Sequence, residues 1–207
     1  MNRLLIGLNE AQCAAVETVD GPLLVIAGAG SGKTRVLTSR LAHILTLRLA
    51  EPYQILAVTF TNKAAGEMRQ RVIQIMGAEI PELQVSTFHS FCARMLRRDA
   101  AALGYNANFT IFDDADSQTL VKNCIRDLGY SDGQFPARGQ RRKISDAKNR
   151  LIGPEAFAAG SSGYFESRTA EIYKLYQQRL HDCNAMDFDD LLCNATLMLR
   201  DIPEVGD

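Results

Sequence analysis

The first half of the chain alternates short continuous apolar runs with stretches in which apolar residues recur every three or four positions. The continuous runs predict buried strands, at 23–27, 55–60 and 85–88. The periodic stretches predict helices, around 36–45, over 62–76, and from 91 to a break at Gly104. Strands that alternate with helices in this way are typical of an α/β fold built on a parallel sheet.

From about Asn108 onward the strand signals stop, and the apolar positions follow helical spacing alone. Helices separated by Gly, Pro and Ser are predicted at 115–128, 141–151 and 165–180. Two glycine-bounded stretches, 129–139 and 160–163, are expected to form loops. The second half is therefore predicted to be a mostly helical subdomain.

The amino-acid composition is that of a packed domain, and the net charge of the chain is close to zero. Hydrophobic residues make up 46% and charged residues 23% of the 207 positions, which excludes a disordered or low-complexity chain. Lys and Arg total 23 against 24 Asp and Glu, so any attraction to nucleic acid must be local. The five cysteines form no C-x-x-C pair, which argues against a disulfide framework or a zinc site. Since no apolar run approaches the roughly 18 residues that cross a bilayer, and the start is too short for a secretory signal, we expect a cytoplasmic protein with no membrane partner.

A glycine-rich segment, Ala-Gly-Ala-Gly-Ser-Gly-Lys-Thr at 27–34, lies where the first predicted strand gives way to a helix, as in a Walker A phosphate-binding loop. Glycines let backbone N–H groups point at a polyphosphate, and the helix N-terminus adds its positive dipole. Lys33 would reach the β- and γ-phosphates and Thr34 would hold Mg²⁺, so both are predicted to serve catalysis. The general pattern has Gly where this chain has Ala27, and the alternative is a turn that only permits tight packing. The predicted nucleotide-binding residues here are Ala27, Gly28, Ala29, Gly30, Ser31, Gly32, Lys33, Thr34 and Arg35.

Four further segments resemble the motifs of one family. Leu-Asn-Glu-Ala-Gln at 8–12 looks like its Q motif, 57–65 like its motif Ia, 86–91 like its motif Ib, and 184–192 like the segment where the chain re-enters the ATPase domain. Over nearly its whole length the chain thus resembles the UvrD/Rep/PcrA-type superfamily I ATP-dependent DNA helicases. The resemblance implies 3′-to-5′ helicase activity, with ATP and Mg²⁺ as cofactors and single-stranded DNA or a single/double-strand junction as partner. It also implies that Gln12 pairs with adenine.

The same resemblance implies an α/β fold: an incomplete P-loop NTPase (RecA-like) parallel-sheet core with an inserted, mostly helical subdomain. The family orders its domains as 1A, then the insertion 1B, then the rest of 1A. We therefore expect domain 1A over 1–107, domain 1B over 108–186, and a return into domain 1A over 187–207.

Polar and aromatic residues near the ends of predicted strands are candidates for DNA contact, because open α/β sheets place their ligands there. Hydroxyls and amides bond phosphates, and an aromatic ring stacks on a base without reading its identity. Core packing remains the alternative for each phenylalanine. With the resemblance, the candidate DNA-binding residues are Thr59, Phe60, Asn62, Thr87, His89 and Phe188.

A basic run lies in the predicted helical part, with one acidic residue, Asp146, among its cations. The cations are Arg138, Arg141, Arg142, Lys143, Lys148 and Arg150. The run is either a face that contacts DNA or a solvated helix surface, and the sequence favours neither.

The family's Walker B segment, an Asp-Glu pair on a buried strand, is not found. Asp113–Asp114 and Asp189–Asp190 are the nearest candidates, and neither resembles it. We therefore expect an amino-terminal fragment without its carboxy-terminal motor domain, which binds Mg·ATP weakly and does not hydrolyse it alone. A small nucleoside-monophosphate-kinase-type phosphotransferase is the alternative, with 138–142 as an Arg-rich lid, and a non-enzymatic interaction module is a third.

Overall fold

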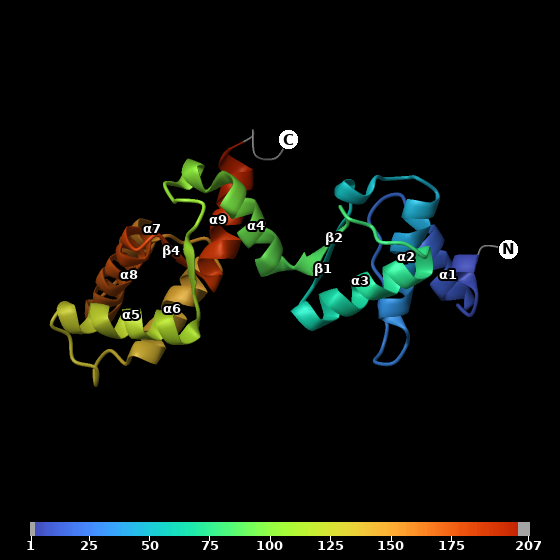
Figure 1. The fold of residues 1–207 in the computed structure, drawn as a ribbon. Helices are drawn as coiled ribbons and strands as arrows, with labels where there is room; N and C mark the ends of the chain where they lie inside the picture. The colour runs from blue at the N-terminus through green and yellow to red at the C-terminus, as the bar shows by residue number, and fades with distance from the viewer. Residues whose placement is uncertain (1–2, 203–207) are drawn as a thin grey trace. The chain divides into compact units, whose positions relative to one another are not determined.

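The computed structural model describes residues 3–202. The chain divides into two compact units, Met1–Phe88 and His89–Asp207 (Figure 1). Within residues 3–202, no helix combines the length and the apolar character that a membrane span requires.

The first unit joins a two-stranded parallel ladder to helices. Its strands pair in register from Leu56 with Gln84 to Thr59 with Thr87, so both strands end at the same edge. Helix α3 begins after Thr61, whose hydroxyl accepts the Ala64 N–H at 3.1 Å. In chain order the elements are η1 (Arg3–Leu5), α1 (Glu10–Glu17), α2 (Lys33–Thr46), η2 (Pro52–Gln54), β1 (Leu56–Thr59), α3 (Asn62–Met76) and β2 (Gln84–Thr87).

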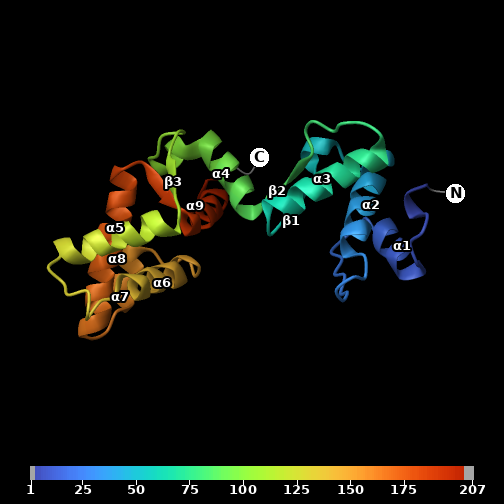
Figure 2. The ribbon, with the colours of Figure 1, turned by 60° about the horizontal axis from the view of Figure 1, so that its bottom comes forward.

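The core of this unit lies where α2 and α3 meet the ladder, and Figure 2 shows α3 running alongside β1 and β2. Its buried apolar residues are Leu41, Ile55, Ala57, Ala65, Met68, Val72, Leu83 and Val85. A smaller cluster of Ala15, Val16 and Val36 packs α1 against α2. The predicted strands at 55–60 and 85–88 are thus confirmed with small shifts of their ends, and the predicted helix over 62–76 is confirmed at the same residues.

The predicted buried strand at 23–27 is wrong. These residues form no strand, and Leu24 and Ile26 are 82% and 89% exposed. A parallel strand is stabilised by ladder hydrogen bonds and by helices that cover its faces. Strands β1 and β2 pair with each other, and no strand within residues 3–202 pairs with this segment.

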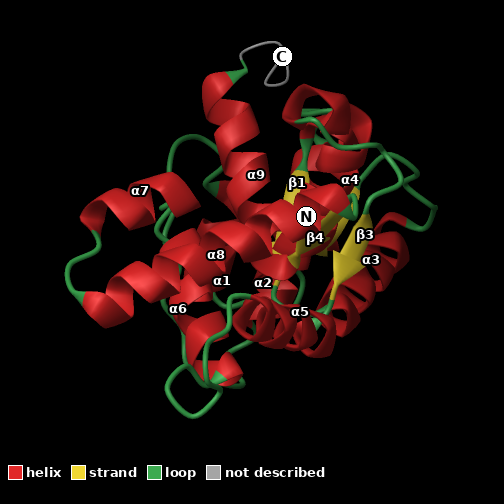
Figure 3. Ribbon diagram, turned by 90° about the vertical axis from the view of Figure 1, so that its left-hand side faces the viewer, coloured by secondary structure: helices red, strands yellow, loops and turns green. Residues whose placement is uncertain are grey.

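The second unit is mostly helical and holds a second parallel ladder, from Thr110 with Ala185 to Phe112 with Asp187. Its strands are yellow in Figure 3. The elements are α4 (Phe88–Asp99), η3 (Ala100–Leu103), β3 (Thr110–Phe112), α5 (Asp114–Asp127), α6 (Ala137–Lys148), α7 (Pro154–Gly160), α8 (Tyr164–Asp182), β4 (Ala185–Asp187) and α9 (Phe188–Asp201).

The sequence prediction for this unit needs three corrections. Strands do not stop near residue 108: β3 and β4 are present, but three residues each are too few for an alternating pattern to be visible. Helix α7 was not predicted. The predicted loop 129–139 is too long, because α6 already begins at Ala137.

Two apolar clusters form the core of the second unit. One lies among α5, α6 and α8, which pack side by side. It includes the buried rings of Phe135, just before α6, and of Tyr176 in α8. The other lies around α4 and α9, with Phe109 and Met186 at its centre. Over the residues that the structure describes, the chain is therefore a mixed helix and strand protein with two small parallel ladders.

Candidate nucleotide and nucleic-acid sites

The predicted phosphate-binding loop precedes α2, and two of its glycines are required by the backbone. Gly30 and Gly32 have φ angles of 73° and 82°, in the left-handed region where a side chain would be strained. Gly32 is the N-cap of α2, so Lys33 and Thr34 are the first residues of the helix. A Cβ on Gly28 or Gly30 would meet nothing within 4 Å, so the loop is open on that side.

Lys33 lies against the loop itself. Its ammonium group donates to the carbonyl oxygens of Ala27 at 2.9 Å and Gly28 at 2.5 Å, and the Ser31 hydroxyl also donates to Gly28 O at 2.7 Å. An exposed cation, the helix dipole and an open glycine loop together form a cradle suited to an anion. Thr34 is exposed at the same end of α2, which suits its hydroxyl as an oxygen ligand for Mg²⁺.

Gln12 ties α1 to the phosphate loop. Its amide oxygen accepts from the Asn9 backbone N–H at 2.9 Å, while the Asn9 side chain accepts from Gln12 N–H, so the two residues form the capping box of α1. Its amide nitrogen donates to Ser31 O at 2.9 Å. The residue expected to pair with adenine therefore lies beside the predicted phosphate site, and its base pairing stays a prediction.

Arg35 contacts the segment before α1. Its guanidinium donates to Ile6 O at 2.9 Å, and a Cβ on Gly7 would come within 2.7 Å of Nη2. Gly7 also has a φ of 75°, a backbone conformation that favours glycine, whereas the nearby guanidinium is the flexible end of a side chain and could shift. In this structure Arg35 holds the chain that precedes α1.

The C-terminal edge of the β1–β2 ladder gathers four of the candidate DNA-binding residues. Thr59 and Thr87 are register partners there, and the Thr87 hydroxyl donates to Asn62 Oδ1 at 3.5 Å. Thr59 donates to the carbonyl of Thr61 at 3.0 Å. Phe60 is 96% exposed, which excludes core packing as the reason for this ring. The edge thus combines hydroxyls, an amide and an exposed aromatic ring.

The other two candidates, His89 and Phe188, meet in the second unit. Their rings are edge-to-face, with centroids 5.4 Å apart and an interplanar angle of 87°. His89 lies in α4, and Phe188 is the first residue of α9 and is 44% exposed. Phe188 therefore packs partly against a neighbour and partly faces solvent.

A buried group of charges lies directly beside Phe188 and was not predicted. Lys148 Nζ contacts Asp187 Oδ2 at 2.7 Å and Asp190 Oδ1 at 2.8 Å, and all three side chains are buried. The Tyr176 hydroxyl donates to Asp187 Oδ2 at 2.7 Å, and Gln177 Nε2 donates to Asp190 Oδ1 at 3.1 Å. We call Lys148, Asp187 and Asp190 the charge cluster.

The cluster shifts the proton affinities of its members in different directions. Burial, with the neighbouring Asp187 charge, raises the pKa of Asp190 to about 6, despite the opposing effect of Lys148. Burial also acts to raise the pKa of Asp187, but Lys148 and the hydrogen bonds to this carboxylate outweigh it and the pKa is lowered. Burial acts to lower the pKa of Lys148, and the two carboxylates reverse this and raise it.

Two signals in the sequence point to this cluster. Asp187 and Asp190 have the spacing of a capping box before a helical stretch, and the structure shows that box. Lys148 follows the buried Ile144 by four positions, so both lie on the same face of α6. Asp189–Asp190 is thus part of a helix N-terminus. Asp113 likewise caps α5, with the N–H groups of Ala115 and Asp116.

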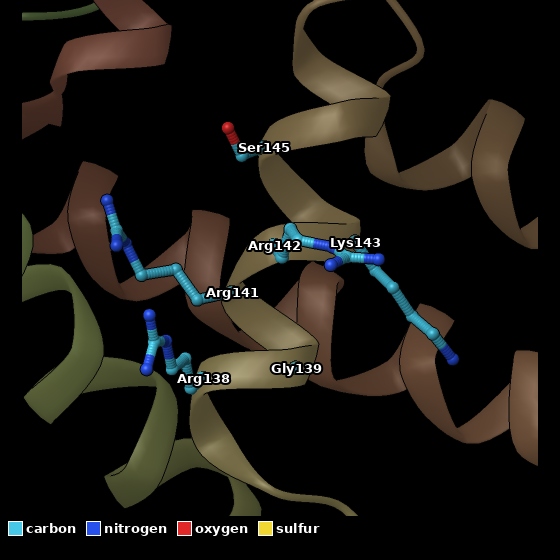
Figure 4. Close-up of a pocket in the computed structure, with 6 residues that line it drawn as sticks. All are labelled: Arg138, Gly139, Arg141, Arg142, Lys143 and Ser145. Carbon is cyan, nitrogen blue, oxygen red and sulfur yellow. The ribbon is translucent and has the colours of Figure 1, made fainter.

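The remaining cations of the basic run lie mainly on the outer face of α6. Four of them, with Gly139 and Ser145, line an open pocket of about 670 Å³: Arg138, Arg141, Arg142 and Lys143 (Figure 4). Figure 4 shows Arg138 and Arg141 pointing to one side of the helix and Lys143 to the other. Arg141 also pairs with Asp114 at the start of α5. The run is therefore divided: Lys148 is a buried ion-pair partner, and for these surface cations both predicted roles stay open.

Within residues 3–202 no group of three or more His, Cys, Asp or Glu side chains is placed to hold a metal ion.

Comparison with known proteins identifies the family. Residues 8–207 match the UvrD/REP helicase N-terminal domain, so the chain belongs to this family and the resemblance is confirmed. The chain is 45% identical over 204 residues to the ATP-dependent DNA helicase PcrA of Bacillus subtilis, which covers 99% of this chain and 28% of that protein. It is 43% identical to the proteins of the same name in Staphylococcus epidermidis and, over 200 residues, in Leuconostoc citreum.

The chain thus spans between 27% and 28% of the length of these relatives. Neither the matched family nor these relatives support the phosphotransferase alternative.

Proposed function

We propose that this chain is the ATP-binding and single-stranded-DNA-contacting amino-terminal part of an ATP-dependent 3′-to-5′ DNA helicase. The relatives are named as ATP-dependent DNA helicases, and the chain matches them over 99% of its length. The observation that carries the proposal is that one unit holds both an open Gly-Lys-Thr loop at the N-terminus of α2 and a strand edge lined by Thr59, Thr87 and the exposed Phe60.

The nucleotide is expected at the loop before α2. Backbone N–H groups of 27–34 and the Lys33 ammonium bind the phosphates, and a polyphosphate would replace the carbonyl oxygens that Lys33 now contacts. Thr34 supplies a hydroxyl to Mg²⁺, which when bound neutralises phosphate charge. Gln12 pairs with adenine from its place beside Ser31.

Single-stranded DNA is expected to contact both units without sequence preference. Thr59 and the exposed Asn62 offer hydrogen bonds to the DNA backbone, and Phe60 offers a face for a base. Thr87 is buried at the same edge, where its hydroxyl donates to Asn62 Oδ1, so it is proposed to act through Asn62. Phe188 offers a second ring, beside His89. A single/double-strand junction is the corresponding substrate of the whole helicase.

The domain division 1–107, 108–186 and 187–207, with a RecA-like sheet in domain 1A, is part of this proposal. It is supported by the β3–β4 ladder, because residues 110–112 and 185–187 pair and so bring together the beginning and the end of the helical stretch. An inserted subdomain is expected to leave and rejoin its host at one place.

On its own the chain is proposed to bind Mg·ATP weakly and not to hydrolyse it. Hydrolysis in phosphate-loop ATPases requires a carboxylate that orders the metal ion, a residue that orients water, and an arginine that neutralises the developing charge. The arginine is worth about 10³–10⁵ in rate. Among the candidates for such carboxylates, Asp113 and Asp190 serve helix N-termini.

The experiment is fluorescence anisotropy of a labelled oligothymidylate titrated with the chain. Phe60→Ala is expected to weaken binding about tenfold, because base stacking on an aromatic ring is worth about 1–3 kcal/mol. Tyr53→Ala is the matched control, since Tyr53 is 63% exposed in the same unit and lies outside the strand edge. Absence of binding by the unmodified chain, or equal losses in both variants, would contradict the proposal.

A further inference from the structure

The charge cluster is a costly feature that the nucleotide loop does not use. Moving an ammonium group or a carboxylate out of water carries a penalty of several kcal/mol, and well-packed apolar side chains often stabilise a core as well. Lys148 and Asp190 are each 3% exposed and Asp187 is 6% exposed. Packing alone does not explain such a cluster. Its position beside Phe188 suggests that it fixes the turn that carries this residue.

Each carboxylate of the cluster divides its two oxygens between the helix turn and the lysine. Asp187 Oδ1 accepts the Asp190 N–H at 2.8 Å, and Asp190 Oδ2 accepts the Asp187 N–H at 3.2 Å. The other two oxygens, Asp187 Oδ2 and Asp190 Oδ1, contact Lys148 Nζ at 2.7 and 2.8 Å. Lys148 therefore holds both ends of the single turn that carries Phe188.

Further bonds tie the same turn to its surroundings. The Cys193 thiol, one turn further along α9, donates to Lys148 O at 2.9 Å, so both the side chain and the backbone of Lys148 contact α9 or its cap. Tyr176 and Gln177 of α8 bond the carboxylate oxygens that face Lys148. The turn is thus fixed from α6 and α8 while the ring of Phe188 remains 44% exposed.

We propose that Lys148 is a positioning residue for DNA binding: through Asp187 and Asp190 it fixes the turn at the start of α9 and so holds the Phe188 ring, edge-to-face with His89, ready to stack on a base. The inference rests on the proposed function, in that Phe188 is taken to contact single-stranded DNA. Lys148 therefore has a third role, different from the two predicted for the basic run, which were direct contact with DNA and a solvated helix surface.

The absence of tryptophan from the sequence allows a direct test. Phe188→Trp and Phe60→Trp each give the chain a single tryptophan at one proposed contact, one in each unit, and its emission is excited selectively over that of the six tyrosines. Both chains are titrated with oligothymidylate, and the emission at saturation is compared with that of the free protein. Both reporters are expected to be quenched, because a base that stacks on the indole quenches it.

Lys148→Met is then introduced into each reporter chain. The quenching of Trp at 188 at saturating DNA is expected to fall at least by half, and that of Trp at 60 to stay the same. Lys174→Met is the matched control, because it removes an exposed cation from α8 outside the cluster and is expected to change neither signal.

A second variant guards against misfolding. Lys148→Met combined with Asp190→Asn removes one charge of each sign, so the cluster keeps its net charge, and the amide oxygen still accepts the Asp187 N–H. The same loss at position 188 is expected in this double variant, with a smaller drop in thermal stability than Lys148→Met alone, because one buried carboxylate and not two is left without a cation.

The outcomes separate the two ideas. If neither reporter responds to DNA in the unmodified background, the proposed function fails. If both reporters respond and the Lys148 variants leave the signal at 188 intact, or lower both signals equally, DNA binding stands and the positioning role of Lys148 is overturned.

Discussion

Both units place an aromatic ring where a strand gives way to a helix, and they fix that junction by different means. After β1, Phe60 is 96% exposed, and the neutral hydroxyl of Thr61 caps the helix that follows. After β4, Phe188 is 44% exposed, and the charged cap Asp187 shares a buried lysine with Asp190. A strand-to-helix junction can thus be fixed by neutral groups where it is exposed, or by charged groups where it is buried. Only the second should respond strongly to pH or to the loss of one cation.

The largest expected difference is in stability. Lys148→Met leaves two buried carboxylates without their cation and should lower the free energy of unfolding by about 3–5 kcal/mol. Thr61→Ala removes one neutral cap and should lower it by about 0.5–2 kcal/mol. Urea unfolding followed through the single-tryptophan reporters at 60 and 188 assigns each loss to its unit. Similar losses in the two variants would remove the contrast between the junctions.

A pH series tests the charged junction alone. Because the folded pKa of Asp190 is raised to about 6 from 3.8, the folded chain holds a proton between those values that the unfolded chain has released. The contribution of this group to stability is therefore greatest below pH 4 and decreases as pH rises to 6. Relative to the unmodified chain, Asp190→Asn should become more stable over this window by about 1–3 kcal/mol. A difference that stays constant from pH 4 to pH 7 in urea unfolding would contradict the assignment.

Nucleotide binding should depend on the first unit. Lys33→Ala should reduce Mg·ATP binding in calorimetry below detection, because the cradle loses its cation beside the β- and γ-phosphates. Lys122→Ala, an exposed lysine of α5 in the other unit, serves as the control and should bind as the unmodified chain does. Phosphate release is measured in parallel. DNA-stimulated hydrolysis by the unmodified chain would show that it holds a carboxylate pair unlike the caps at Asp113 and Asp187.

The smallest expected effect concerns base choice. If Gln12 pairs with adenine, the unmodified chain should prefer ATP to GTP, and Gln12→Ala should abolish that preference. The variant also loses the bond to Ser31 O, so a modest fall in affinity for both nucleotides is expected. Competition binding with the two nucleotides measures the ratio. Equal affinities for ATP and GTP in the unmodified chain would contradict the adenine-pairing role. Gln12 would then only cap α1 and join it to the phosphate loop through Ser31 O.

Local patterns in the sequence predicted the elements whose formation depends on near neighbours. The helix over 62–76 and the glycine loop before Lys33 are both predicted from short segments, and the structure adds Thr61 as the cap of this helix. The strand predicted at 23–27 failed, because its formation depends on a partner strand that no local pattern encodes.

The candidate site was predictable to a similar degree. Residue type and position suggested Thr59, Phe60 and Thr87, and the ladder register brings them to one edge. The burial of Lys148 was missed, because a run of like charges suggests a surface, and its periodicity with Ile144 was the only contrary signal. The interaction between α6 and α9 that defines the cluster is a tertiary contact with no counterpart in local sequence.

The β3–β4 ladder sets how freely the helical stretch can vary in length. Phe112 pairs with Asp187, so the chain leaves β3 and returns to β4 within about two residue lengths along adjacent strands. The entropy of closing such a loop grows only with the logarithm of its length, so doubling the excursion adds about 0.6 kcal/mol. Insertions in the loops of the helical stretch, such as 161–163 between α7 and α8, should therefore leave the ladder in place. The helical stretch can change in size while the residues at its base keep their positions.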